Sequence, residues 1–177
     1  MLKKQIKALE RMCGHEFNGK QQGNAFIRNG NTFVVDGYKI VVVRNEVPEL
    51  VEKYPLHPDV QKTIDTHISW IKNVNAVCPL PKMSFLKEFI KEHGCRRSSA
   101  STKEKMIRIA DEHNIIHAFN VFYLLDVYEA LNIGKQEVYA GCRNQHEPIY
   151  VGCDEGFAMI LPVRHSDTTY DYKGDVM

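Results

Sequence analysis

The sequence has little that would support catalysis, metal binding or insertion into a membrane. Its five cysteines, at positions 13, 78, 95, 142 and 153, form no C-x-x-C pair, although structural zinc sites often use such short spacings. There is no glycine-rich loop of the kind that holds phosphates, and no histidine accompanies a recognisable nucleophile elbow. No apolar run approaches the ~20 residues needed to span a bilayer. The odd number of cysteines and the lack of an export signal predict reduced, mostly buried thiols.

Two groups of polar residues come closest to a chemical site. Cys142, His146 and Cys153 fall within one predicted hairpin, but zinc needs three or four ligands that converge at about 2.0–2.3 Å. The acidic pairs at 111–112 and 154–155 fall in predicted turns, where such side chains commonly stabilise the backbone. We therefore predict no metal, no cofactor and no catalytic residue, and a small metal protein or enzyme is the least favoured alternative.

The composition is that of an ordinary globular protein. The chain has 177 residues, of which 44% are hydrophobic and 25% are charged, so it can form one large domain or two small ones with a real core. Its formal net charge of +1 argues neither for nor against a nucleic-acid partner. Residues 1–4 lead into an amphipathic stretch rather than the apolar core of a signal peptide. We expect a cytoplasmic protein that does not associate with membranes.

Periodicity and turn residues predict alternating helices and strands. Helices are predicted at 3–12, 85–93 and 121–131, with Ser84 and Asn120 as N-caps of the last two. Alternating or β-branched patterns between turn signals predict strands at 24–28, 32–35, 38–44, 77–80, 106–110, 115–119, 136–141, 148–153 and 157–163.

Three segments differ from this pattern. Residues 46–75 are punctuated by prolines and include a potential helix at 59–74 that carries Trp70, which we interpret as a core anchor within a long insertion. Polar residues predict a mobile loop at 96–105 and a flexible tail at 165–177.

Three motifs occur in order along the chain. Residues 35–40 read Val-Asp-Gly-Tyr-Lys-Ile, and residues 77–82 read Val-Cys-Pro-Leu-Pro-Lys before a predicted helix. The third motif begins with Phe-Asn-Val-Phe-Tyr at 119–123 and ends with Leu-Pro-Val-Arg at 161–164. Together they resemble motifs of the bacterial DNA sliding clamp, the β subunit of DNA polymerase III, which tethers a polymerase to DNA. The third is the most specific, because its two parts lie at nearly the separation found in the family.

The resemblance implies a non-enzymatic protein that binds linear peptide motifs of DNA replication or repair partners. In the family, these motifs build an apolar cleft between the middle and last domains, and the cleft takes a short peptide from polymerases and other clients. Such a cleft needs apolar pockets for anchor side chains and a few polar groups that fix the register. Carried over to this chain, the implied peptide-binding residues are Val35, Gly37, Tyr38, Lys39, Ile40, Pro81, Asn120, Tyr123, Leu161, Pro162, Val163 and Arg164.

The resemblance also implies contact with duplex DNA, because family clamps face phosphates with basic residues on helices. A solvated lysine-rich helix surface is the favoured alternative interpretation of the same residues. We therefore expect weak, salt-sensitive and sequence-independent DNA binding at most. The candidate residues are Lys3, Lys4, Lys7, Arg11, Lys82, Lys87, Lys91, Arg96 and Arg97.

The chain also departs from the family, whose members have three domains. The first domain has no counterpart here, and the half-domain expected before residue 115 is missing or shortened. We predict an α+β, DNA-clamp-like fold of antiparallel β-sheets with helices packed on one face. Residues 1–112 would form a clamp-like unit with an insertion at about 46–75, and residues 113–164 a half-domain like the clamp C-terminus. We expect a shortened paralogue or a protein of a phage or other mobile element. The alternative is a salt-sensitive DNA-binding accessory protein without peptide binding, which closes a ring by self-association as a homo-oligomer.

Overall fold

The computed structural model describes most of the chain, in ranges that together contain all the elements discussed below. These ranges are 1–14, 16–17, 20–21, 23–56, 64–66, 68, 76–98, 101, 103–134, 138–166 and 168–174. The helices are α1 (Lys3–Cys13), α2 (Pro48–Lys53), α4 (Met83–Glu92), α5 (Val121–Ala130) and the short 3-10 helix η2 (Lys103–Lys105). The strands are β1 (Glu16–Phe17), β2 (Lys20–Gln21), β3 (Asn24–Arg28), β4 (Asn31–Val35), β5 (Lys39–Val43), β6 (Ala76–Leu80), β7 (Met106–Ala110), β8 (Ile116–Asn120), β9 (Val138–Cys142), β10 (Ile149–Cys153) and β11 (Gly156–Ile160).

One large sheet organises the molecule. Seven of the described strands pair in the order β3-β4-β5-β11-β10-β9-β6, and every neighbouring pair is antiparallel. β7 and β8 form a separate antiparallel hairpin, and β1 pairs with β2. Because β5 pairs with β11 and β6 pairs with β9, the sheet crosses the boundary that the sequence places between residues 112 and 113.

The junction between β5 and β11 depends on a glycine. Gly156 lies opposite Val43 and has a φ of +153°. A Cβ atom at this position would lie 1.9 Å from the carbonyl oxygen of Val42, a distance that no side chain tolerates. Glycine is therefore required for the two strands to approach this closely.

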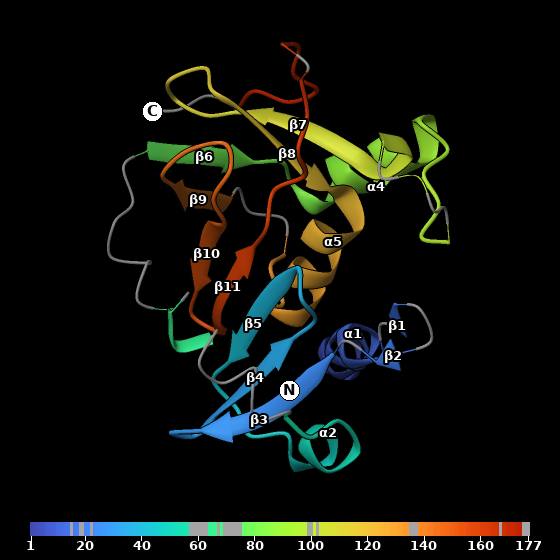
Figure 1. Cartoon of the computed structure of the whole chain (residues 1–177), viewed down its shortest axis with the longest axis vertical. Helices are drawn as coiled ribbons and strands as arrows, with labels where there is room; N and C mark the ends of the chain where they lie inside the picture. Colours follow the sequence, from blue (N-terminus) through green and yellow to red (C-terminus); the bar gives the residue numbers. More distant parts are fainter. Residues whose placement is uncertain are drawn as a thin grey trace.

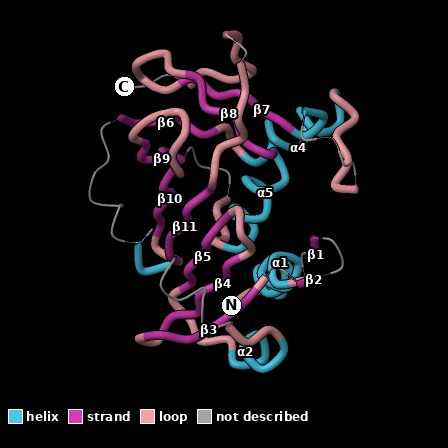
Figure 2. The backbone as a smooth tube through the Cα atoms, in the orientation of Figure 1, coloured by secondary structure: helices cyan, strands magenta, loops and turns pink. Residues whose placement is uncertain are grey.

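Helices α1, α4 and α5 lie together on one face of the sheet (Figures 1 and 2). Strand alternation divides β5 between the two faces: Val41 and Val43 pack in the core beneath the helices, whereas Ile40 and Val42 belong to a second hydrophobic cluster. That second cluster includes Ile64, from the segment predicted as an insertion. The predicted α+β fold with helices on one face is thus confirmed, while Trp70 lies outside the described residues.

The sequence predicted side-chain N-caps for α4 and α5, and the structure contains only the second of them. The side chain of Asn120 accepts a hydrogen bond from the backbone N–H of Phe122 at 3.0 Å, so the predicted N-cap of α5 is confirmed. Helix α4 begins at Met83, with Lys82 in the N-cap position and no side-chain cap. The prediction of Ser84 as a cap was therefore wrong, because Ser84 lies inside the first turn.

Residues 171–172, near the C-terminal end of the described chain, pack against the β7–β8 hairpin. Tyr172 pairs with Ile109 in a parallel bridge, and Asp171 forms an ion pair with Arg108 at 2.8 Å. The sequence predicted a flexible tail from residue 165 because these residues are polar. The structure instead gives several of them backbone and ionic partners that local composition does not reveal. None of the described helices is long and apolar enough to cross a bilayer.

Candidate functional site

The turn between β4 and β5 positions the first site residues. Asp36 Oδ1 accepts hydrogen bonds from the backbone N–H groups of Tyr38, at 3.1 Å, and Lys39, at 3.0 Å. Gly37 adopts a φ of +81°, which a glycine reaches without strain. The turn leaves Tyr38 38% exposed and directs Lys39 inward, where only 4% of the residue is exposed.

Residues from distant motifs meet beside this turn. The rings of Tyr38 and Tyr123 stack with their centroids 5.3 Å apart and an interplanar angle of 26°. Lys39 Nζ lies 4.3 Å from the centroid of the Tyr123 ring, which is within cation–π range. The backbone N–H of Leu161 donates to the carbonyl of Tyr38 at 2.9 Å. The first motif and both parts of the third motif, which begins at Phe119, therefore converge on one surface.

Burial raises the pKa of Tyr123, and the nearby negative charge of Asp36 raises it further, while a hydrogen bond with Asn120 acts in the opposite direction. The phenol therefore keeps its proton at neutral pH. It is a hydrogen-bond donor on the first turn of α5, next to the exposed ring of Tyr38.

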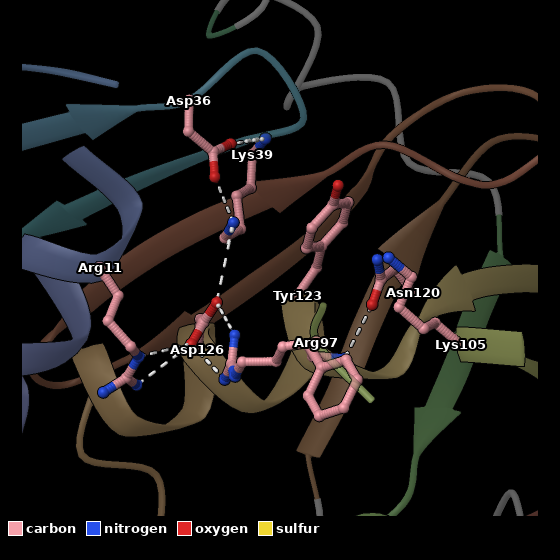
Figure 3. A pocket seen from close by; sticks show the side chains of 9 residues that line it. Arg11, Asp36, Lys39, Arg97, Lys105, Asn120, Tyr123 and Asp126 are labelled. Atoms are coloured by element: carbon pink, nitrogen blue, oxygen red, sulfur yellow. Dashed lines mark hydrogen bonds and ion pairs between the residues drawn. The ribbon is translucent and has the colours of Figure 1, made fainter. Parts of the chain in front are cut away.

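A network of ion pairs centred on Asp126 lies close to Tyr123 (Figure 3). Arg97 donates to both carboxylate oxygens of Asp126, at 2.8 and 3.0 Å, and Arg11 donates to Oδ1 at 3.1 Å. Lys39 pairs with Asp36 and lies 3.9 Å from Asp126. The Asp126 side chain is only 5% exposed, so its charge depends on these cations for compensation.

A cavity of about 260 Å³ opens onto this network. The described residues that line it are Arg11, Asp36, Lys39, Arg97, Lys105, Asn120, Phe122, Tyr123 and Asp126. Four of these side chains are cationic and two are carboxylates, so the cavity differs from the apolar cleft that the resemblance implies. The difference has a local cause: strand alternation places Lys39, rather than Ile40, on the helical side of β5.

The structure brings together only some of the implied peptide-binding residues. Val35 and Ile40 pack in the hydrophobic cluster on the opposite face of the sheet. Pro81 is buried, and its carbonyl accepts a hydrogen bond from the Tyr128 hydroxyl at 2.8 Å. The backbone N–H of Val163 donates to the carbonyl of Ala118 at 2.7 Å. The implied residues that meet at the site are Gly37, Tyr38, Lys39, Asn120, Tyr123 and Leu161. Four other implied residues do not line the described cavity: Pro81, Pro162, Val163 and Arg164.

The nine basic residues predicted to contact DNA lie in two different environments. Arg11 and Arg97 form ion pairs with Asp126, so their charges are largely compensated within the protein. The others are exposed on α1, at the start of α4, along α4 or just after it: Lys3, Lys4, Lys7, Lys82, Lys87, Lys91 and Arg96. Asp36, Asp126 and Lys105 were not predicted as site residues. An aspartate within the apolar run 124–127 was the one available signal for a buried ion pair.

This chain resembles solved structures of DNA polymerase III β subunits, among them the following two. One, from Eubacterium rectale and assigned to the DNA polymerase III β subunit, matches with a TM-score of 0.54 and 16% identity, over 91% of this chain and 64% of that one. The other is DNA polymerase III subunit β from Borrelia burgdorferi in complex with a natural product, with a TM-score of 0.51 and 10% identity, over 93% of this chain and 64% of that one. No family model and no curated protein matches the sequence.

These likenesses show a clamp-like fold. They extend over most of the chain, and the chain spans about two thirds of the length of either clamp subunit (64%). At 10–16% identity the sequences are strongly divergent.

Proposed function

We propose that this protein is a non-enzymatic, clamp-like module that binds a short linear peptide of a DNA replication or repair protein on the surface around Tyr38 and Tyr123. The observation that carries the proposal is the stacking of these two rings, 5.3 Å apart, where the first and third motifs meet. The clamp-like fold supports it, since one of the two structures compared above is a DNA polymerase III β subunit and the other is assigned to that subunit.

The chemistry of the surface favours a peptide with two kinds of side chain. Tyr38 offers an exposed aromatic ring, on which an apolar or aromatic anchor residue can pack. The adjoining cavity contains more cationic side chains than carboxylates, so it favours an acidic or amide side chain next to the anchor. Such a peptide would bind in an extended conformation, with anchors that set its register.

Fluorescence anisotropy with a labelled peptide of the Gln-x-x-Leu-Phe type tests this proposal. Tyr38→Ala and Tyr123→Ala should each weaken binding by about 1–2 kcal/mol, which corresponds to about 5- to 30-fold in Kd. Tyr170→Ala is a matched control, because Tyr170 is 50% exposed and lies in the tail rather than at the site. Circular dichroism spectra establish that each variant is folded.

Two results would count against peptide binding at this surface. One is the absence of any anisotropy change at hundreds of micromolar protein. The other is an equal loss of affinity in Tyr38→Ala and Tyr170→Ala, since a general aromatic effect would then explain both.

We also propose that the protein binds duplex DNA weakly and without sequence preference through α1. We further propose that it self-associates, so that several copies of α1 surround the duplex. Lys3, Lys4 and Lys7 are exposed there, and lysines bind phosphates without reading bases. Changing all three to glutamate should reduce the slope of log affinity against log salt by about 2–3 if three phosphate contacts are lost. Light scattering measures the oligomeric state, and an unchanged salt slope in the triple variant would exclude this surface.

A further inference from the structure

Three buried side chains meet where the β7–β8 hairpin approaches the large sheet, away from the tyrosine surface. Asp111 follows β7, His117 lies in β8 and Cys142 ends β9. His117 Nε2 is 2.9 Å from Asp111 Oδ2, and Cys142 Sγ is 3.9 Å from the same oxygen. One potential ligand atom from each residue lies within 4.8 Å of the other two, and no residue of the three is more than 1% exposed.

The backbone holds the carboxylate of Asp111 in a fixed orientation. Its Oδ1 accepts hydrogen bonds from the N–H groups of His113, at 2.8 Å, and Ile115, at 2.9 Å. Oδ2 is therefore left facing His117 and Cys142. This loop is also tied to the edge of the large sheet, because the N–H of Glu112 donates to the carbonyl of Val77 at 3.1 Å. The three side chains thus come from two sheets that are fixed relative to each other at this point.

The imidazole of His117 can turn a lone pair toward the cluster. Its Nδ1 is buried and has no hydrogen-bond partner among the described residues. Without a metal, the 2.9 Å contact with Asp111 favours the proton on Nε2, so a metal ion bound at Nε2 would require the proton to be on Nδ1. With the proton on Nδ1, the lone pair of Nε2 points toward Asp111 and is available to a metal ion.

We propose that Asp111, His117 and Cys142 supply three ligands to one zinc ion. A carboxylate, an imidazole and a thiolate are the ligand types that zinc takes in proteins. With a neutral imidazole, the two anionic ligands balance the charge of the dication, so the filled site is neutral and its burial carries little electrostatic penalty. Ligand atoms around a tetrahedral zinc lie roughly 3–4 Å apart, given bond lengths of about 2.0–2.3 Å, so the side chains need shifts of less than about 1 Å.

Cys78 shares this face of the sheet, but it is not one of the residues whose ligand atoms lie within 4.8 Å of one another, so it is not assigned as a ligand. Ala76 pairs with Cys142 across β6 and β9, so Cys78, two residues along β6, presents its side chain on the same face of the sheet as Cys142. Cys78 is fully buried. The sequence predicted no metal site because none of these residues has a short-spaced partner; the cluster exists only once β6, β8 and β9 are in register.

The alternative is a buried hydrogen-bonded cluster that holds no ion. In that case His117 donates to Asp111, and the Cys142 thiol donates to Asp111 or to the carbonyl of Ala76, 3.5 Å away. Metal analysis distinguishes the two. The full chain, purified without a histidine tag, is equilibrated with zinc and gel-filtered, and zinc is measured by mass spectrometry. One zinc per chain is expected, and substoichiometric zinc overturns the proposal.

Cobalt identifies the ligands. Co²⁺ bound at the site should give tetrahedral absorption together with thiolate-to-cobalt charge transfer, and a spectrum without the charge-transfer band overturns the assignment of Cys142. Cys142→Ala should weaken binding by more than about 100-fold, since even residues that only support a ligand change affinity by about 10–100-fold. Cys153→Ala is the control: Cys153 is half-buried and outside the cluster, so this variant should keep its metal.

A protection experiment covers the case in which Cys142→Ala fails to fold. The wild-type chain is treated with a thiol reagent with and without zinc, in mild denaturant, and the modified cysteines are mapped by mass spectrometry. Zinc should slow the modification of Cys142 and leave that of Cys153 unchanged. Equal rates for Cys142 with and without zinc, or loss of metal in Cys153→Ala, overturn the proposed site.

Discussion

Replacing Lys39 with methionine tests whether the ion pairs close to Tyr123 hold this part of the fold together. The side chains of Lys39 and Asp36 are only 2% and 1% exposed, and they pair with each other. Both charges have lost their hydration, so each depends on the other for compensation. Removing one partner of such a pair typically costs about 3–5 kcal/mol, because the remaining charge stays buried.

The surroundings place each single variant at the lower end of that range. In Lys39→Met, Asp36 keeps two backbone N–H donors, and Asp126 keeps Arg11 and Arg97. In Asp36→Asn, Lys39 keeps Asp126 at 3.9 Å. We therefore expect each to lower the free energy of unfolding by about 3 kcal/mol. The double variant leaves neither charge, so it should cost about 2–3 kcal/mol less than the sum of the two.

Urea unfolding followed by circular dichroism measures these free energies, provided that the m-values agree between variants. Arg28→Met is the matched control, because Arg28 and Asp65 form an ion pair in which both side chains are about half exposed (47% and 50%). It should change stability by less than about 1 kcal/mol. Additive effects of Lys39→Met and Asp36→Asn, or a cost for Lys39→Met no larger than that of Arg28→Met, would refute the reasoning.

Three further variants test single interactions. Tyr128→Phe removes a buried hydrogen bond to the carbonyl of Pro81 and should lower the free energy of unfolding by about 1–2 kcal/mol, seen as a Tm drop of about 3–6 °C in a thermal melt. Asn120→Ala removes the cap of α5 and should cost about 1 kcal/mol in urea titrations, whereas Asn120→Asp should cost much less. Burial alone would raise the pKa of Asp171, but its hydrogen bonds and ion pair with Arg108 lower it. Ionised Asp171 therefore stabilises the folded protein above the ordinary aspartate pKa, and this stabilisation is lost as the pH falls through the lowered pKa of the folded state. Asp171→Asn should lower the free energy of unfolding at pH 7 by up to about 1 kcal/mol and should have little effect well below about pH 4.

The sequence predicted most of the helices and strands and the meeting of the first and third motifs, but not helix α2 (Pro48–Lys53). Helix α5 could be predicted from an apolar run that follows an asparagine cap, and the β4–β5 hairpin from the turn residues Asp36 and Gly37. The contact between Tyr38 and Tyr123 followed from the resemblance rather than from any local pattern. Periodicity alone does not say which strands become neighbours in a sheet.

The charged character of the cavity could not be predicted in the same way. An aspartate in a turn and an arginine in a polar loop each have an ordinary solvent-exposed interpretation, and that interpretation is correct for most such residues. Only the packing of α1 and α5 against β5 brings Arg11, Lys39 and Asp126 within reach of one another. The same holds for Asp111, His117 and Cys142, which depend on the position of one hairpin relative to the large sheet.

The aromatic pair and the ion network have one structural origin, and this links recognition to stability. The turn at Asp36 exposes Tyr38 and buries Lys39, and α5 supplies both Tyr123 and Asp126. A peptide anchored on Tyr38 therefore lies next to charges that the fold already requires for its own ion pairs. An acidic peptide residue would compete with Asp126 for Arg97, whose side chain is 42% exposed, more readily than for Lys39, which is buried. Selectivity for charge in a client peptide should accordingly depend on Arg97, and Lys39 should matter mainly for holding Tyr123 in place.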